Sequence, residues 1–334
     1  MYGKTRKEVA DKLKELSQKQ AEGMNLDACN ITVADFLTRW LADVVAQRNK
    51  PRTHESYEQL LTAHVIPQIG KVSLTGLKPD RVQRLLNDLS KQGLSPRTVN
   101  YIRAILRRAL NEAVLWRYVS YNAAALVTPP RAEKHKVVPL TREEARKLLD
   151  ALKGHRLEPL YLMALLLGLR RGEVLGLLVG NLDFERGTVR VEGALQWQRG
   201  KLVRDSVKTA SSVRVLPLPS TLVPLLRDHL AVQQARFPEN EYLFASTSGT
   251  PINPRNLLRQ FKELLRKAKL RDIRFHDLRH SCATFLIAQG VNPRVVMEIL
   301  GHSQISVTMN TYGHVMQETQ AEAIQGVTQL LTGD

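Results

Sequence analysis

Cysteine is almost absent from this sequence, and no stretch of it is long and apolar enough to cross a membrane. Its two cysteines, Cys29 and Cys282, lie far apart and in no spacing typical of metal ligands. The longest apolar run, residues 159–169, is about half as long as a membrane span. The first residues are too charged for a signal peptide. These absences argue against a secreted or membrane protein and predict reduced thiols and a cytoplasmic location.

Acidic residues are also scarce relative to basic ones. The 334 residues include 49 Lys and Arg against 32 Asp and Glu, a net charge of +17. Residues 1–138 hold 23 basic and 13 acidic side chains, and residues 139–334 hold 26 and 19, so both parts are basic. Such a balance usually indicates a polyanionic partner, most often nucleic acid. Composition alone leaves a merely basic protein as the alternative.

The pattern of residues 30–122 predicts a small helical bundle, because helical periodicity dominates there and no strand pattern interrupts it. Thr32 opens a variant of the capping box, and Ser95 followed by a proline is a helix start. We expect the second helix of the bundle to stop at Pro67. The expected helices cover residues 32–45, 53–66, 79–93 and 96–114.

A polar stripe runs along the last of these helices. Its members share one helical face and are Asn100, Arg103, Arg107 and Asn111. A stripe of this kind can contact a DNA backbone. An ordinary solvated helix face is an equally good interpretation.

A second domain is expected after the proline-rich, charged linker at residues 128–136. Thr141 opens a new helix with a capping box. Residues 181–191 and 212–216 carry strand and turn signals, and helical patterns return from residue 254. The predicted fold class is therefore mainly α with one small antiparallel β-sheet.

Four short clusters in this second part carry groups that suit phosphate chemistry. They are Gly-Leu-Arg170-Arg-Gly-Glu173, Val-Lys208-Thr, His276-Asp-Leu-Arg279-His280, and Leu-Gly-His302-Ser followed by Thr-Tyr312. Guanidinium groups grip phosphate oxygens, and cationic neighbours make a tyrosine nucleophilic by stabilising its phenolate. Together the clusters predict a protein that holds a phosphodiester and attacks it with a phenol.

Single clusters also have plainer interpretations. Arg171 competes with Arg170 for the phosphate, and the pair can equally be ordinary surface residues. Glu173 is placed to orient a guanidinium group. Lys208 is expected on a hairpin tip that reaches into a DNA groove, although lysines in turns are common.

The histidine cluster has a rival interpretation as a zinc site. His276 and His280, four residues apart and next to Asp277, resemble the H-E-x-x-H pattern, with Glu298 as a third ligand. The shorter acid and the neighbouring Arg279 count against this interpretation. A buried structural histidine is a further alternative.

With these residues in place, the chain resembles the tyrosine recombinases, the phage integrase family, over nearly its whole length. The residues that match the family's catalytic set are Arg170, Lys208, His276, Arg279, His302 and Tyr312. Residues 52–57 and 95–100 resemble its core-binding domain, which adds Arg52 and Arg97 to the DNA-binding candidates. Many phage integrases carry an arm-binding domain that this chain is expected to lack, either naturally or by removal.

The resemblance implies a domain organisation. An N-terminal helix or linker covers residues 1–28, and a helical, SAM-like core-binding domain covers 29–126. A linker at 127–138 leads to a mixed α/β catalytic domain at 139–334, with a C-terminal docking helix. That helix docks on a neighbouring protomer or folds back on its own domain. The two domains are implied to close as a C-shaped clamp on duplex DNA.

The implied reaction is site-specific strand exchange. Tyr312 attacks the scissile phosphorus, giving a 3′-phosphotyrosyl link and a free 5′-hydroxyl. The two arginines and His302 stabilise the developing charge, His276 is the general base and Lys208 the general acid. Because the phosphotyrosine preserves the bond, no ATP is required. Because arginines stabilise the charge, no metal or other cofactor is expected.

The implied partners are double-stranded DNA with paired recombination sites and three further copies of the chain in a DNA-bound homotetramer. Accessory DNA-bending or directionality proteins are possible additions, and the implied location is the nucleoid of a prokaryotic host. A non-catalytic DNA-binding protein is the main rival, but it predicts loss of at least one of the six positions. A type IB topoisomerase shares the chemistry, but the separate helical domain argues against it.

Overall fold

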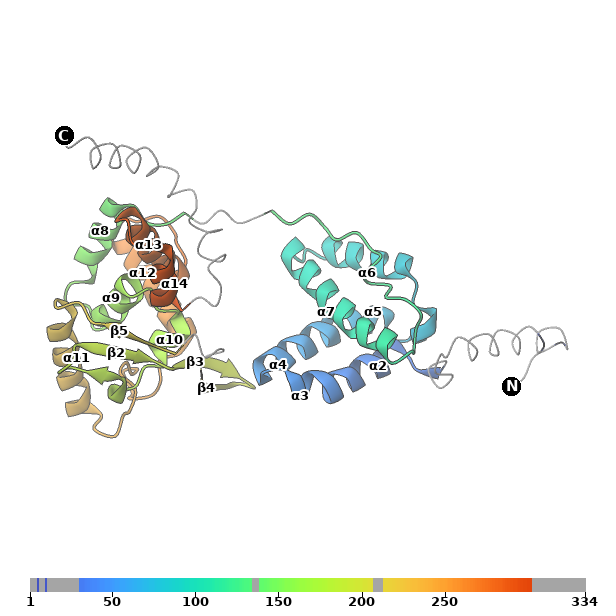
Figure 1. The fold of residues 1–334 in the computed structure, drawn as a ribbon, viewed down its shortest axis with the longest axis horizontal. Helices are drawn as coiled ribbons and strands as arrows, with labels where there is room; N and C mark the ends of the chain where they lie inside the picture. The colour runs from blue at the N-terminus through green and yellow to red at the C-terminus, as the bar shows by residue number, and fades with distance from the viewer. Residues whose placement is uncertain (1–4, 6–9, 11–29, 134–137, 207–212, 302–334) are drawn as a thin grey trace, which may run out of the picture. The chain divides into compact units, whose positions relative to one another are not determined.

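The computed structural model describes residues 5, 10, 30–133, 138–206 and 213–301. The chain divides into two compact units, Met1–Lys134 and His135–Asp334 (Figure 1). Each unit has its own hydrophobic core. Helices dominate both units, and the strands are short and antiparallel, so the predicted fold class is confirmed. Within the described ranges, no helix combines the length and apolar character needed to cross a membrane.

Unit 1 is built from helices. They are α2 (Val33–Trp40), η2 (Leu41–Val45), α3 (Ala46–Arg48), α4 (Pro51–Leu60), η3 (Leu61–Val65), α5 (Ile66–Ile69), η4 (Leu74–Gly76), α6 (Pro79–Lys91) and α7 (Pro96–Leu115). The predicted capping box is confirmed, because Thr32 accepts from the Asp35 amide and the Asp35 carboxylate accepts from the Thr32 amide. Ser95 is likewise the N-cap of α7, where its side chain accepts a hydrogen bond from the Thr98 amide. Inside the bundle, the ring of Trp40 stacks on Tyr57 at a centroid distance of 6.0 Å.

The prediction that Pro67 ends its helix is wrong. Helix α4, the turn η3 and α5 follow one another without a break from Pro51 to Ile69. The turn η3 is a π-helical turn, in which the Ile66 amide donates to the Leu61 carbonyl five residues back. A proline lacks the amide donor, and its ring crowds the preceding turn of a regular helix. We attribute the passage of the helix through Pro67 to the wider turn just before it.

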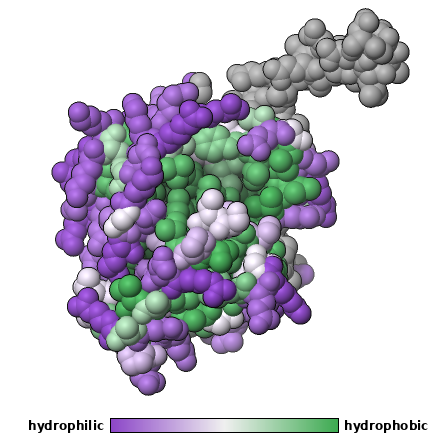
Figure 2. All heavy atoms as spheres, turned by 90° about the vertical axis from the view of Figure 1, so that its left-hand side faces the viewer, coloured by the Kyte–Doolittle hydropathy of each residue, from purple (hydrophilic) through white to green (hydrophobic). Residues whose placement is uncertain are grey.

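Unit 2 combines helices with two small sheets. Its elements are α8 (Arg142–Leu152), α9 (Glu158–Leu166), α10 (Arg171–Leu175), η5 (Val179–Asn181), β1 (Leu182–Asp183), β2 (Thr188–Val191), β3 (Gly193–Gln198), β4 (Lys201–Ser206), β5 (Arg214–Pro217), α11 (Leu222–Arg236), α12 (Pro254–Lys267), α13 (Phe275–Ala288) and α14 (Pro293–Leu300). The capping box at Thr141 is confirmed. Figure 2 shows one face of unit 2, on which hydrophobic residues gather in the middle and hydrophilic residues surround them.

The strands form two sheets where the sequence predicted one. One sheet has the antiparallel order β1-β2-β5, and the other is the hairpin of β3 and β4. Arg199 and Gly200 turn this hairpin, and both have positive φ, as a tight two-residue turn requires. The hairpin escaped prediction because its strands are largely half-exposed and lack a clean apolar alternation.

The core of unit 2 contains a cluster of three aromatic rings. Phe261 of α12 lies 5.8 Å from the ring of Tyr161 in α9 and 5.5 Å from that of Phe275 in α13. All three side chains are buried. These rings join α9 to α12 and α13, which follow it by about a hundred residues in the chain, so they form a long-range contact in the fold.

We expect Phe261→Ala to lower the free energy of unfolding of unit 2 by about 3–5 kcal/mol, because it removes a large side chain from a closed core. Unit 1 has a separate core, so its unfolding transition should stay where it is. Differential scanning calorimetry of the whole chain measures both transitions. Leu106→Ala in α7 is the matched control and should shift the other transition; a common shift for either variant would contradict two separate cores.

Candidate active site

A left-handed glycine connects α9 to one of the candidate arginines. Gly168 has a φ of +61°, and its carbonyl accepts a hydrogen bond of 2.8 Å from Nη1 of Arg279. Arg279 belongs to α13 and is 1% exposed. A Cβ at position 168 would lie 2.5 Å from Cδ2 of Leu300, so a side chain has no room there. Both the turn and the close packing therefore require glycine at this position.

Arg170 is held at the start of α10 by three hydrogen bonds. Its Nη1 donates to Oε1 of Glu173 at 2.6 Å, and its amide donates to Oε2 of the same carboxylate at 3.0 Å. Its Nη2 donates to the carbonyl of Gly301 at 3.0 Å. Arg171 is exposed and has no hydrogen-bond partner among the described residues. The geometry therefore favours Arg170 as the guanidinium that the fold holds in place.

Glu173 is a buried carboxylate between two arginines. Its side chain is 3% exposed, and its Oε2 also accepts a 2.9 Å hydrogen bond from Nη2 of Arg214. Burial alone would raise the pKa of Glu173, but the charges and hydrogen bonds of Arg214 and Arg170 hold it below its usual range. The carboxylate is therefore ionised at neutral pH, which gives Arg170 a fixed anionic partner.

The sequence analysis missed Arg214, although a signal for it was present. In β5, the buried positions are those of Arg214 and Leu216, and the valines at 213 and 215 are exposed. Strict alternation along Val-Arg-Val-Leu would have placed an arginine on the buried face. A buried arginine needs an anionic partner, and Glu173 is that partner.

Helix α13 brings the candidate histidine to the same place. The rings of His276 and His280 lie 4.9 Å apart, nearly perpendicular. His276 keeps an exposed edge, but the crowding around its ring desolvates it and lowers its pKa to about 4. The positive charges of His280, Arg279 and Arg170 act in the same direction. His276 is therefore neutral at pH 7 and able to accept a proton.

Asp277, the acid of the rival zinc interpretation, has a structural role. It accepts from the amide and the guanidinium group of Arg274, at 2.8 Å each, and closes the N-terminus of α13. Glu298, the suggested third ligand, pairs with Arg294 on the surface of α14. The described residues contain no group of His, Cys, Asp and Glu that could hold a metal. The zinc interpretation therefore has neither its general base nor its third ligand in place.

Cys282 is the one cysteine within the described residues, and it is a free thiol. It is buried in α13, where its Sγ donates to the Leu166 carbonyl at 3.3 Å. Burial raises the pKa of this thiol to about 12. A thiol that stays protonated is a poor nucleophile, so Cys282 does not compete with a tyrosine for that role.

The other three candidates, Lys208, His302 and Tyr312, lie outside the described residues. Lys208 falls between the end of β4 and the start of β5, whereas the tip of the described hairpin is at residues 199–200. His302 follows Gly301, which ends α14 in the left-handed conformation with a φ of +64°. Glycine commonly ends a helix in this conformation.

In unit 1, part of the polar stripe on α7 binds the chain's own backbone. Nδ2 of Asn100 donates to the Pro130 carbonyl at 2.9 Å, and Nη2 of Arg103 reaches the Ala125 carbonyl at 3.5 Å. Both side chains are half-buried by the segment that returns along the helix. Asn111 also contacts this segment, because its Oδ1 accepts from Nδ2 of Asn122 at 2.6 Å, so three of the four stripe residues hold the segment after α7.

The remaining candidates are exposed. They are Arg52 at the start of α4, and Arg97 and Arg107 on α7. Arg97 and Asn100 also line a groove of about 880 Å³ between the two helices. The other residues that line the groove are Ser56, Gln59, Leu60, Ala63, His64, Thr98, Tyr101 and Ala104. The groove is open, and its lining mixes polar side chains with aliphatic and aromatic ones.

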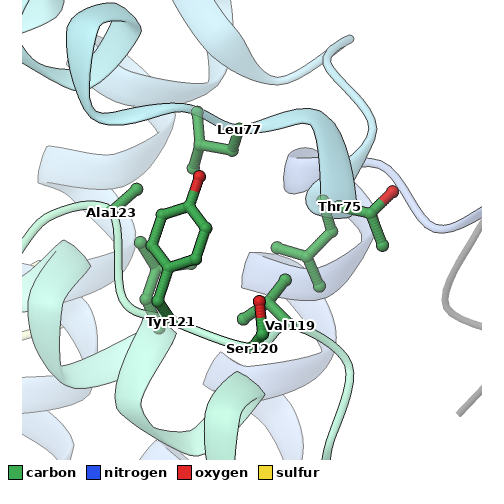
Figure 3. Close-up of a pocket in the computed structure, with 8 residues that line it drawn as sticks. Thr75, Leu77, Val119, Ser120, Tyr121 and Ala123 are labelled. Carbon is green, nitrogen blue, oxygen red and sulfur yellow. The ribbon is translucent and has the colours of Figure 1, made fainter. Parts of the chain in front are cut away.

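A second, smaller hollow in unit 1 has a volume of about 100 Å³ (Figure 3). The ring of Tyr121 stands in it with the hydroxyl toward Leu77, and Thr75 and Ser120 supply the other hydroxyls at its wall. Pockets for small-molecule ligands usually enclose about 300–1,000 Å³. The hollow is therefore too small for a substrate site and carries no charged side chain.

Family models match both parts of the chain. Residues 139–319 match the phage integrase family, and residues 32–90 match the phage integrase N-terminal SAM-like domain. The chain belongs to the phage integrase family. Its members named below are tyrosine recombinases and integrases, enzymes that break and rejoin DNA strands. The resemblance stated from the motifs is thus confirmed.

Among its relatives, a protein named tyrosine recombinase XerC-like from Caldanaerobacter subterraneus is 33% identical over 98% of this chain and 91% of its own length. An integrase from Streptomyces ambofaciens is 30% identical over 93% of this chain and 83% of its own length. The Tn1549 transposon integrase, solved in complex with transposon right-end DNA, aligns with a TM-score of 0.76 over 87% of this chain and 100% of its own. At 21% identity that structure bears on the fold alone.

We expect Gly168→Ala to destabilise this recombinase by about 2–4 kcal/mol, because the new methyl group strains the backbone and collides with Leu300. Gly154→Ala is the matched control. Gly154 has a φ of +73° and nothing within 4 Å of its Cβ position, so only strain of about 1–2 kcal/mol is expected. Urea unfolding measures both, and equal effects would contradict the close packing at Gly168.

We expect the His276 ring to titrate near pH 4 in the free protein, by nuclear magnetic resonance. His280→Gln should raise that pKa, because it removes one of the positive charges that lower it. The unfolded chain takes up this proton near pH 6.5, whereas the folded chain takes it up near 4. This histidine therefore costs stability as the pH falls from about 6.5 to 4. A midpoint above 6 in the wild type would contradict the crowded cationic setting.

Proposed function

We propose that this tyrosine recombinase performs site-specific strand exchange with Tyr312 as nucleophile and Arg170, Lys208, His276, Arg279 and His302 as the groups that assist it. Tyr312 attacks the scissile phosphorus and forms a 3′-phosphotyrosyl bond. The 5′-oxygen leaves as a hydroxyl after protonation. The same bond is later attacked by a 5′-hydroxyl of the partner strand, which releases the tyrosine and restores the DNA backbone without ATP.

One observation carries the proposal: three of the six groups, from segments a hundred residues apart, converge on the loop around Gly168. Arg279 bonds to the Gly168 carbonyl, and Arg170 follows two residues later in the chain. The His276 ring is close enough to both guanidinium groups for their charges to lower its pKa. Two cations and a neutral base beside one another suit a phosphodiester with a nearby nucleophile better than they suit any buried structural task.

The roles follow from protonation states. The two arginines stay charged and offer planar forks to the non-bridging oxygens, where negative charge grows in the transition state. His276, neutral at pH 7, accepts the proton of Tyr312. Lys208 gives a proton to the leaving 5′-oxygen, and His302 adds a hydrogen bond to the phosphate. No step in this scheme calls on a metal ion.

The DNA partner is double-stranded and carries paired recombination sites. In the core-binding domain, which we assign to residues 29–126, the exposed Arg52, Arg97 and Arg107 are proposed to bind phosphates. Asn100 and Arg103 would act there as well, with the polar groups that their backbone contacts leave over. The catalytic domain, assigned to residues 139–334, supplies the second half of the basic surface.

Strand exchange joins two duplexes at four cleavage sites, so the active assembly is proposed to be a homotetramer on DNA. The chain's C-terminal segment is the proposed docking element. Accessory DNA-bending or directionality proteins would decide between integration and excision. The proposed place of action is the nucleoid of a prokaryotic cell, where such DNA is found.

We expect wild-type protein to form a covalent adduct with nicked duplexes from the ends of the genetic element that encodes it, with EDTA present. Tyr312→Phe should bind the same duplexes with equal affinity and give no adduct, because the phenol oxygen is the proposed nucleophile. A denaturing gel separates the adduct, and sequencing the trapped DNA locates the cleavage site. An adduct in Tyr312→Phe would remove Tyr312 from its role, and binding without any adduct in the wild type would favour a non-catalytic DNA-binding protein.

A further inference from the structure

Arg214 is the most deeply buried partner of the active-site carboxylate, and none of the four sequence clusters contains it. Its side chain projects from β5 and is 7% exposed. Nη2 donates to Oε2 of Glu173 at 2.9 Å, and Nε donates to the Ile299 carbonyl at 2.7 Å. It thus joins the small sheet to α10 and to the last turn of α14.

The contacts of Arg214 and Arg170 close a ring. Both guanidinium groups bond to the Glu173 carboxylate, one at each oxygen. Both also bond to carbonyls at the end of α14, Arg214 to Ile299 and Arg170 to Gly301. The position of the Arg170 fork is therefore set by a carboxylate that Arg214 also binds and by the Gly301 carbonyl, two residues after the Ile299 carbonyl that Arg214 binds.

The backbone at the end of α14 also packs closely against Arg214. A Cβ at Gly301 would lie 2.9 Å from Nη1 of Arg214, so the backbone of this turn rests against the guanidinium group. Gly301 is the residue whose carbonyl binds Arg170, and it directly precedes His302 in the chain. A shift of Arg214 would therefore move both partners of Arg170 together.

We propose that Arg214 is a positioning residue of the recombinase: it fixes Glu173 and the end of α14 so that the Arg170 fork stands ready for the scissile phosphate. This inference rests on the proposed role of Arg170. Without Arg214, Glu173 keeps one cation in place of two, and Oε2 is left with the Arg170 amide alone. The carboxylate would then turn toward Arg170 or toward solvent, and the fork would leave its position.

The first test replaces Arg214 by methionine, which keeps the length of the side chain and removes its charge and donors. Single-turnover cleavage of the nicked duplex is measured at saturating protein, together with DNA affinity and the melting temperature. We expect cleavage to slow by about 10- to 100-fold, because small misplacements of a catalytic group are costly, while DNA affinity stays unchanged. Arg190→Met on the neighbouring strand β2 is the matched control. Arg190 pairs with Glu192 on the surface, and its loss should leave cleavage at the wild-type rate.

A double-mutant cycle separates positioning from general damage to the fold. If Arg214 acts through Arg170, then Arg214→Met should slow an Arg170→Lys enzyme far less than it slows the wild type. The same substitution in an Arg279→Lys enzyme should show its full effect, because Arg279 is held by Gly168. Equal slowing in both backgrounds would overturn the proposal.

If Arg214→Met does not fold, Arg214→Lys takes its place. A lysine keeps a cation beside Glu173 but lacks the planar fork that serves Glu173 and Ile299 together. Slower cleavage with wild-type DNA affinity would support positioning, and cleavage at the wild-type rate would overturn it. A wild-type enzyme that forms no adduct would instead count against the proposed function itself.

Discussion

The buried carboxylate of Glu173 is the interaction on which unit 2 and its chemistry depend. It lies inside the protein and is ionised because Arg214 and Arg170 approach it from two sides. Buried ion pairs are seldom a net source of stability, since desolvation costs about as much as the attraction returns. Here the ion pairs fix geometry. Glu173, Arg170 and Arg214 bond to one another in a single arrangement, and this arrangement sets the position of the Arg170 guanidinium group.

Two left-handed glycines extend this arrangement into the backbone. Gly168 and Gly301 each offer a carbonyl to an arginine, Arg279 in one case and Arg170 in the other. A residue with a Cβ would be strained at either φ and would strike Leu300 or Arg214. Arg279 is thus bound by a main-chain oxygen, a rigid acceptor that carries no charge of its own, whereas Arg170 is bound both by the Gly301 carbonyl and by the ionised Glu173. For the proposed phosphate chemistry, these contacts fix the positions of both guanidinium groups before the substrate binds.

Much of this could be predicted from sequence, because the decisive signals are local. Capping residues predicted the starts of the helices at Thr32, Ser95 and Thr141, and the structure confirms each of them. Local sequence patterns do not show which distant segments of the chain contact one another in the fold. The role of Arg214 depends on Glu173, forty-one residues away, and three of the four residues of the α7 stripe bind a segment that folds back on that helix. The prediction that Pro67 ends its helix was wrong for a related reason, because the π-helical turn that precedes this proline has no simple sequence signature.

The hydrogen bonds at either end of the connection between the units set the length of a tether. Asn100 fixes the Pro130 carbonyl to unit 1, and the Leu140 amide donates to Ser281 in unit 2. The chain between these two anchors can span at most about 36 Å when fully extended. Under the proposed function, in which both units bind DNA, this length limits the distance between the two anchors and holds the second unit at a raised effective concentration near the DNA. On that proposal, two weak contacts with DNA give a higher overall affinity than either contact gives alone.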